Sequence, residues 1–124
     1  HFKRINDTYG HVCGDAILHD FAHLVSARLR KSEFLARYGG EEFALTLPET
    51  DIRGAGIVAE SIRLLVEKHT FSWEDHLLSV TISIGGALLG PEMGTVGELV
   101  QAADDELYKA KRGGRNRVCL AKDD

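Results

Sequence analysis

The chain has 124 residues, of which 44% are hydrophobic and 27% are charged, so its composition favours one compact, soluble domain. Its formal net charge of −4 argues against bulk electrostatic binding to nucleic acid or to an acidic membrane surface. No apolar run approaches the roughly 18 residues that a membrane span needs. Two cysteines without metal-type spacing indicate a reduced, cytoplasmic setting, although such a domain can belong to a membrane-bound parent protein.

The first half of the chain predicts a helix followed by a β-hairpin. The first ten residues are polar and rich in turn formers, which favours a loop. Apolar side chains at steps of three and four then predict a helix from about Asp15 to Arg30. Two extended runs flank Gly39-Gly40, and a tight turn with positive φ at both central positions suits glycine. The second run alternates apolar and polar residues, so one face of its strand is expected in the core.

The second half predicts two helices and two strands. Thr50 or Asp51 can cap a helix whose apolar stripe runs to Val66. Residues 70–77 are expected as a loop, and clean alternation predicts a strand over residues 78–84. Thr95 and Glu98 form a capping box that opens the last helix, and Gly113-Gly114 ends it. Residues 118–120 are then expected as a short strand. The alternation of helices and strands along the chain predicts an α/β domain with helices packed on a mixed sheet.

The predicted hairpin carries the first group of residues that could perform chemistry. Gly39 and Gly40 lack a Cβ, so backbone can approach a ligand closely there. Glu41 and Glu42 follow directly, and two carboxylates can hold a divalent cation with its bound phosphates. The simpler alternative is a hairpin turn followed by two solvated acids, and the hairpin taken alone favours that alternative.

A second group lies near the start of the chain. Lys3 precedes a predicted helix start, where a lysine and free N–H groups can bind phosphate oxygens. Asn6 and Asp15 offer complementary donors and acceptors for a purine edge. A carboxylate can accept two N–H bonds from guanine that adenine does not offer. The alternative is that Asp7, Thr8 and Asp15 only form turns and caps, and this group taken alone favours that alternative.

The third group surrounds the end of the last predicted helix. Lys111 and Arg115 can gather polyphosphate charge, the lysine as a point charge and the arginine through bidentate bonds. Alternatively, these cations complement the negative end of the helix dipole. One short basic cluster on an acidic chain does not favour nucleic-acid binding.

In order and spacing, these three groups resemble one family, the GGDEF domains. FKRINDTYGHVCGD resembles its first loop and helix entry, RYGGEEF its name motif in the GGEEF form, and SVTISIG and ADDELYKAKRGGRNRV its later strand and last helix. The resemblance runs from His1 to about Val118. It implies a nucleotidyl-cyclase palm, with an antiparallel-rich mixed sheet flanked by helices. It also implies a diguanylate cyclase, a transferase that condenses two GTP into cyclic di-GMP and two pyrophosphate in bacterial signalling.

The resemblance also implies a role for individual residues. Gly39 and Gly40 would let GTP phosphates pass close to backbone. Glu41 would bind Mg²⁺ or Mn²⁺ and help deprotonate the 3′-hydroxyl, with Glu42 supporting that site.

The remaining implied roles concern GTP and protein partners. Guanine would be read by Asn6 and Asp15. The β- and γ-phosphates would be held by Lys3, Lys111 and Arg115. Two such domains, each holding one GTP, would face each other as a homodimer, under control of an upstream sensory domain.

The sequence departs from the family in two places. Family members have a first strand, ending in an acidic metal ligand, shortly before the position of His1. We therefore expect residues 1–124 to be an N-terminally truncated GGDEF catalytic domain that synthesises little product alone. A product-binding Arg-x-x-Asp site of many members corresponds here to Arg30 and Glu33. Because Glu33 is one methylene longer than aspartate, we favour the simpler interpretation of a surface pair worth under about 1 kcal/mol.

Three other functions fit the resemblance less well. A degenerate GGDEF domain could bind GTP or cyclic di-GMP as a regulatory module, but the intact acids at Glu41 and Glu42 argue against it. A cyclase with another base preference is opposed by Asp15. A dimerisation module without a nucleotide leaves all three groups unexplained.

Overall fold

The computed structural model describes residues 2–89 and 93–121, without the side chains of Phe2 and Lys3. The chain divides into two compact units, which are described separately. The first unit comprises residues 1–48 and 66–80, and the second comprises residues 49–65 and 81–124. Both combine helices with short strands, so the predicted α/β class is confirmed.

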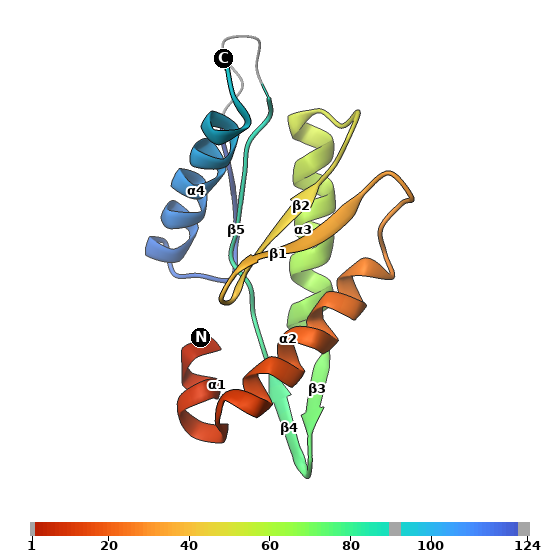
Figure 1. Ribbon diagram of the computed structural model, residues 1–124, viewed down its shortest axis with the longest axis vertical. Coiled ribbons are helices and arrows are strands. Elements are labelled where there is room, and N and C mark those ends of the chain that lie inside the picture. Colours follow the sequence, from red (N-terminus) through yellow and green to blue (C-terminus); the bar gives the residue numbers. More distant parts are fainter. Residues whose placement is uncertain (1, 90–92, 122–124) are drawn as a thin grey trace. The chain divides into compact units, whose positions relative to one another are not determined.

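The first unit combines two helices with two antiparallel hairpins (Figure 1). Its elements are α1 (Phe2–Tyr9), α2 (His11–Ser26), β1 (Phe34–Gly39), β2 (Glu42–Thr46), β3 (Thr70–Trp73) and β4 (His76–Ser79). Helix α2 contacts α1, β1 and β3. It therefore joins the elements of this unit.

The core of the first unit forms on one face of α2. Cys13 and Ile17 lie one turn apart on this helix and are buried, as is Phe71 of β3. The rings of Phe21 on α2 and Phe43 on β2 lie with their centroids 5.0 Å apart. Burial raises the pKa of the Cys13 thiol, which keeps it neutral and fits the prediction of an ordinary small core residue.

The prediction of a loop over the first ten residues was wrong, because residues 2–9 form α1. Ile5 and Tyr9 lie one helical turn apart and are half-buried, and the Tyr9 ring packs against His76 with centroids 4.9 Å apart. Gly10, with a φ of 91°, separates α1 from α2. Helix α2 therefore begins at His11 rather than Asp15, and it ends four residues before the predicted Arg30.

The predicted loop over residues 70–77 and strand over residues 78–84 also differ from the structure. Residues 70–73 form β3 and pair with β4, which ends at Ser79, while the next strand begins only at Ile84. The short turn between β3 and β4 has Glu74 at a φ of 52°. A two-residue turn of Glu and Asp does not carry the glycine that normally signals a hairpin in a sequence.

The second unit consists of a helix, α4, packed on a parallel pair of strands, together with most of α3 (Figure 1). Its elements are α3 (Ile52–Lys68), of which residues 52–65 belong here, β5 (Ile84–Gly86), α4 (Val96–Arg112) and β6 (Val118–Leu120). Gly85 makes the close contact of α4 with β5 possible. A Cβ at Gly85 would overlap the backbone nitrogen of Leu107, so no larger residue fits without moving the helix.

The predicted capping residues are at the starts of α3 and α4. The Thr95 hydroxyl accepts a bond from the backbone N–H of Glu98 at 3.2 Å, and the Glu98 carboxylate accepts one from Gly94. Asp51 accepts a bond from the backbone N–H of Gly54 at 2.7 Å. Of the two candidates that the sequence offered for α3, Asp51 is therefore an N-terminal capping residue.

Replacing Asp51 by alanine is expected to lower the free energy of unfolding by about 1 kcal/mol, because one N–H at the start of α3 loses its acceptor. Asparagine would keep a side-chain oxygen at the same place, so Asp51→Asn should cost only a few tenths of a kcal/mol. Urea unfolding of both variants measures the difference. Equal losses would show that the charge of Asp51, and not its hydrogen bond, supports the helix.

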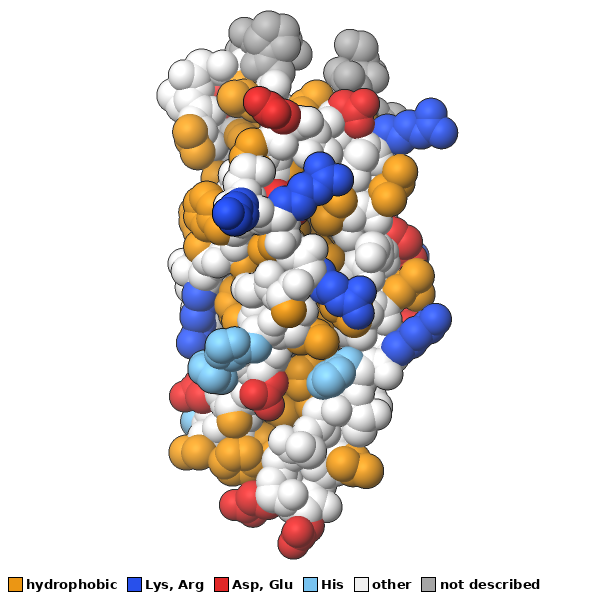
Figure 2. Space-filling view, turned by 90° about the vertical axis from the view of Figure 1, so that its right-hand side faces the viewer, with side chains coloured by type: hydrophobic (Ala, Val, Ile, Leu, Met, Phe, Trp, Pro, Cys, Tyr) orange, Lys and Arg blue, Asp and Glu red, His pale blue; other side chains and the backbone are white. Residues whose placement is uncertain are grey.

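The surface drawn in Figure 2 mixes side chains of opposite charge. Lysine and arginine side chains are interspersed there with acidic and hydrophobic ones. This mixture agrees with the low net charge of the chain. Among the described residues, no helix is both long enough and apolar enough to span a bilayer.

Candidate active site

The β1–β2 hairpin carries the glycine pair and the two acids at its exposed end. Gly39 pairs with Glu42, so the turn consists of Gly40 and Glu41 rather than of the two glycines as predicted. Of the two turn residues, only Gly40 has a positive φ, of 52°, so this turn has one left-handed position. The register shifts between Arg37 and Gly39, which is a β-bulge.

Arg37 holds the conformation of this turn. Its Nε donates a hydrogen bond of 2.8 Å to the carbonyl oxygen of Gly40, across the end of the hairpin. Arg37 was not among the residues predicted to act at the site. Its place two residues before Gly39, in the segment RYGGEEF, is the one signal that could have identified it.

Gly39 and Gly40 leave open space beside the backbone. A Cβ built at either position would meet nothing within 4 Å. Positive φ explains glycine at position 40, but Gly39 has neither a positive φ nor a crowding neighbour among the described residues. A glycine that the fold does not require, at an exposed end, is suited to close approach by a ligand.

The two carboxylates at this end are suited to a hard cation. Glu41 and Glu42 are both exposed and adjacent in the chain. Mg²⁺ is commonly bound through one or two carboxylates together with substrate phosphates and water, so this pair fits it. In the described part of the chain, no group of three or more acidic, histidine or cysteine side chains could hold a metal by itself. Phosphate oxygens and water are ligands that could complete the coordination of a cation held by this pair.

The predicted guanine-reading residues lie on the two helices at the start of the chain. Asn6 is half-buried on α1, and its backbone carbonyl accepts a hydrogen bond from Gly10. Asp15 is exposed on α2, one turn beyond the helix start. Lys3 lies within α1 rather than before a helix, and its side chain is outside the described residues.

Arg30 and Glu33 form a turn after α2. The Glu33 carboxylate accepts a hydrogen bond of 2.8 Å from the backbone N–H of Arg30, and the Glu33 N–H donates to the Arg30 carbonyl. The favoured interpretation, a pair of opposite charges, is therefore only partly right, because the carboxylate contacts backbone and not the guanidinium. A product-binding role for these residues stays a prediction.

Some of the lysine and arginine side chains at the basic end of α4 contact a side chain of the same helix, and others do not. Lys109 donates a bond of 2.9 Å to the buried Glu106, which raises the pKa of Lys109. The Arg112 guanidinium lies 5.6 Å from the centre of the Tyr108 ring. Lys109 and Arg112 thus already contact other side chains of α4.

Two of the three predicted phosphate ligands, Lys111 and Arg115, lie at or just after this end of α4. Lys111 is half-buried and Arg115 is exposed. Neither side chain makes a hydrogen bond or an ion pair with a residue that the structure describes. This leaves both free to bind an anion. They belong to the second unit and Glu41 to the first, so their sharing of one pocket stays a prediction.

The sequence also matches a known family. The model of the family described as diguanylate cyclase, GGDEF domain, matches residues 1–117. The chain belongs to the GGDEF family. Among curated relatives, this GGDEF chain is 42% identical over 121 residues to diguanylate cyclase A of Treponema denticola. It is 41% identical over 119 residues to the response regulator PleD of Caulobacter vibrioides.

These relatives are much longer proteins. The matched region is 98% of this chain but 33% of diguanylate cyclase A, and 94% of this chain but 26% of PleD. The chain therefore spans about a third or less of these two relatives. An activity of the whole relatives is accordingly a proposal for this chain.

Solved structures of GGDEF domains share the fold. The active GGEEF domain of a diguanylate cyclase from Vibrio cholerae is 34% identical with a TM-score of 0.89, over 99% of this chain and 78% of that one. The GGDEF domain of DgcB from Caulobacter crescentus, in complex with c-di-GMP, is 36% identical with a TM-score of 0.91, over 99% and 71%. The predicted cyclase-palm fold is thus confirmed.

Proposed function

We propose that this GGDEF domain is the catalytic part of a cytoplasmic diguanylate cyclase, which condenses two GTP into cyclic di-GMP and two pyrophosphate. The observation that carries the proposal is the exposed Gly39-Gly40-Glu41-Glu42 hairpin end in a member of this family. A degenerate site would not need to keep Gly39, which the described fold does not require, together with both acids.

Different residues of the chain are proposed to bind the guanine base and the phosphates of GTP. Asp15, and with it Asn6, would bind the guanine edge. The terminal phosphates would pass beside Gly39 and Gly40, where no side chain blocks the backbone. Lysine and arginine at the end of α4 and near the start of α1 would bind the β- and γ-phosphates: Lys111, Arg115 and Lys3.

In the proposed reaction, the 3′-oxygen of one GTP attacks the α-phosphorus of the other. The new P–O bond forms as the bond to the bridging β-phosphate oxygen breaks, and pyrophosphate leaves. The Glu41 carboxylate accepts the proton of the 3′-hydroxyl. Bound Mg²⁺ or Mn²⁺ would lower the pKa of that hydroxyl and neutralise phosphate charge, and Glu41 with Glu42 would hold it. The second reaction exchanges the roles of the two nucleotides and closes the ring.

Two domains are needed because each is proposed to hold one GTP. A pair with twofold symmetry would bring each 3′-hydroxyl to the α-phosphorus of the other nucleotide. Catalysis would then consist mainly of positioning and electrostatic stabilisation, as in other phosphoryl-type transfers. An upstream sensory domain would act by controlling how often the two domains meet.

We expect the specific activity of the full-length protein to rise linearly with its concentration until dimers predominate. The measurement is incubation with GTP and Mn²⁺, with pyrophosphate release as the rate and the product identified by mass. A rate per enzyme that does not change with concentration would contradict catalysis between two associating domains. GTP binding without pyrophosphate release would indicate a regulatory module, and a mixed dinucleotide would indicate another base preference.

A further inference from the structure

The segment between α4 and β6 has an unusual backbone. Arg115 has a φ of 65° and Asn116 a φ of 46°, so two consecutive residues other than glycine are left-handed. Such a conformation is strained for a residue with a Cβ and persists only where surrounding contacts determine it. The contacts that hold this segment therefore decide where the Arg115 side chain begins.

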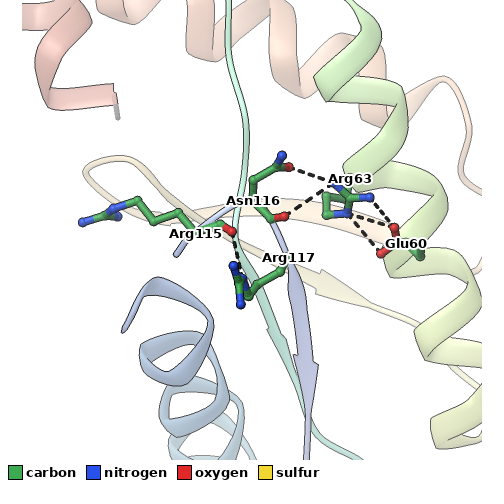
Figure 3. A network of polar contacts seen from close by, with 5 residues as sticks. All are labelled: Glu60, Arg63, Arg115, Asn116 and Arg117. Atoms are coloured by element: carbon green, nitrogen blue, oxygen red, sulfur yellow. Dashed lines mark hydrogen bonds and ion pairs between the residues drawn. The ribbon is translucent and has the colours of Figure 1, made fainter. Parts of the chain in front are cut away.

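Hydrogen bonds hold the segment on both sides of Arg115 (Figure 3). The backbone N–H of Arg115 donates to the carbonyl of Ala110 at 3.0 Å, and Arg117 Nε donates to the carbonyl of Arg115 at 3.0 Å. From α3, Arg63 Nη1 donates to Asn116 Oδ1 at 2.9 Å and approaches the Asn116 carbonyl at 3.5 Å. Arg63 thus fixes the residue that follows Arg115.

Glu60 determines the direction of the Arg63 side chain. Arg63 Nε lies 3.0 and 3.1 Å from the two Glu60 carboxylate oxygens, and Nη2 also donates to Oε1. Because a guanidinium is planar, binding Nε and Nη2 to Glu60 directs Nη1 toward Asn116. The hydrogen bond from Arg63 also lowers the pKa of Glu60, which keeps the carboxylate ionised.

We propose that Arg63, oriented by Glu60, is a positioning residue that sets the affinity for the terminal phosphates of the nucleotide by fixing the backbone beneath Arg115. Figure 3 shows the Arg115 side chain extending away from Arg63 and Asn116, so Arg63 acts on the phosphates only through Arg115. The inference builds on the proposed function, in which Arg115 binds the β- and γ-phosphates.

A lysine cannot replace Arg63 in this role. Its ammonium is a point donor at the end of a flexible stem, and it cannot hold Glu60 through two nitrogens while a third reaches Asn116. Arg63→Lys therefore keeps the charge and removes the geometry. Arg53→Ala is the matched control, because Arg53 is an exposed arginine on the same helix with no polar partner among the described residues.

The test compares the binding of GTP and of GMP to the full-length protein by calorimetry. Arg63→Lys should weaken GTP binding about tenfold, which corresponds to the loss of one charge-assisted hydrogen bond. GMP binding should stay unchanged. A change that merely loosened the fold would weaken both nucleotides. Unchanged GTP binding by Arg63→Lys, an equal loss of both nucleotides, or the same loss in Arg53→Ala would overturn the positioning role.

Two further variants keep the test independent of stability. Asn116→Gly favours the left-handed backbone but removes the side-chain oxygen that Arg63 binds, so it should fold at least as well and still bind GTP more weakly. Arg115→Ala should weaken GTP binding much less in the Arg63→Lys background than alone, and full additivity would contradict coupling. Unaltered protein that binds GTP but forms no cyclic di-GMP would overturn the proposed function alone.

Discussion

Glu41→Gln is expected to lower the rate of cyclic di-GMP formation by about a thousandfold, since it removes both the proposed proton acceptor and a negatively charged metal ligand. Glutamine has nearly the same shape as glutamate, and Glu41 is an exposed turn residue. The free energy of unfolding should therefore change by less than about 0.5 kcal/mol. The loss of activity would then come from chemistry and not from the fold.

The matched control is Glu49→Gln, an exposed glutamate soon after the same hairpin. It loses the same charge and should keep the full rate. The measurements are pyrophosphate release with Mg²⁺ or Mn²⁺ and calorimetric binding of GTP without metal, which should survive in Glu41→Gln. A Glu41→Gln protein with more than about a tenth of the normal rate would contradict the role proposed for this carboxylate.

Local sequence signals predicted the elements whose cause lies within a few residues. The β1–β2 hairpin follows from the placement of its glycines, and the cap of α3 follows from the short acceptor side chain of Asp51. The last strand follows the end of α4 at Gly113. The hairpin and the cap do not depend on distant parts of the chain, whereas the last strand, β6, also needs its partner β5. For the same reason the segment RYGGEEF could be recognised from the sequence alone.

The mispredicted elements are those that tertiary contacts decide. Helix α1 is short and mostly polar, and it is completed by the packing of Tyr9 against His76, far along the chain. Strand β3 pairs across a turn without glycine, and this strand, which carries the buried Phe71, contacts α2. Isolated helices and hairpins of this length are marginal in water, so their sequences carry weak signals.

The candidate site divides in the same way. Glycines, acids and basic residues could be assigned from their type and spacing. The network of Glu60, Arg63 and Asn116 could not, because Arg63 and Asn116 are 53 residues apart and only the fold brings them together. Sequence therefore identified the groups proposed to touch substrate, and the structure was needed for the residues that orient them.

Phe71→Ala is expected to lower the free energy of unfolding by about 3–5 kcal/mol, the usual loss for a phenylalanine removed from a packed core. Phe71 is 1% exposed, lies opposite Leu78 in the β3–β4 pair, and its ring packs edge-on against His69 with centroids 4.6 Å apart. Because a loss of that size can unfold a marginal domain, Phe71→Leu, which leaves a smaller cavity, gives a measurable intermediate of about 1–2 kcal/mol.

Leu77→Ala is the control on the opposite face of the same hairpin. Leu77 is 76% exposed, so truncating it should cost less than about 0.5 kcal/mol. Trp73 is the single tryptophan of the chain and ends β3, so its fluorescence follows urea unfolding at this place. Equal midpoints for Phe71→Ala and Leu77→Ala would mean that β3 is not part of the core. A graded loss from Leu77→Ala through Phe71→Leu to Phe71→Ala is expected, because the cost follows the buried volume that each change removes.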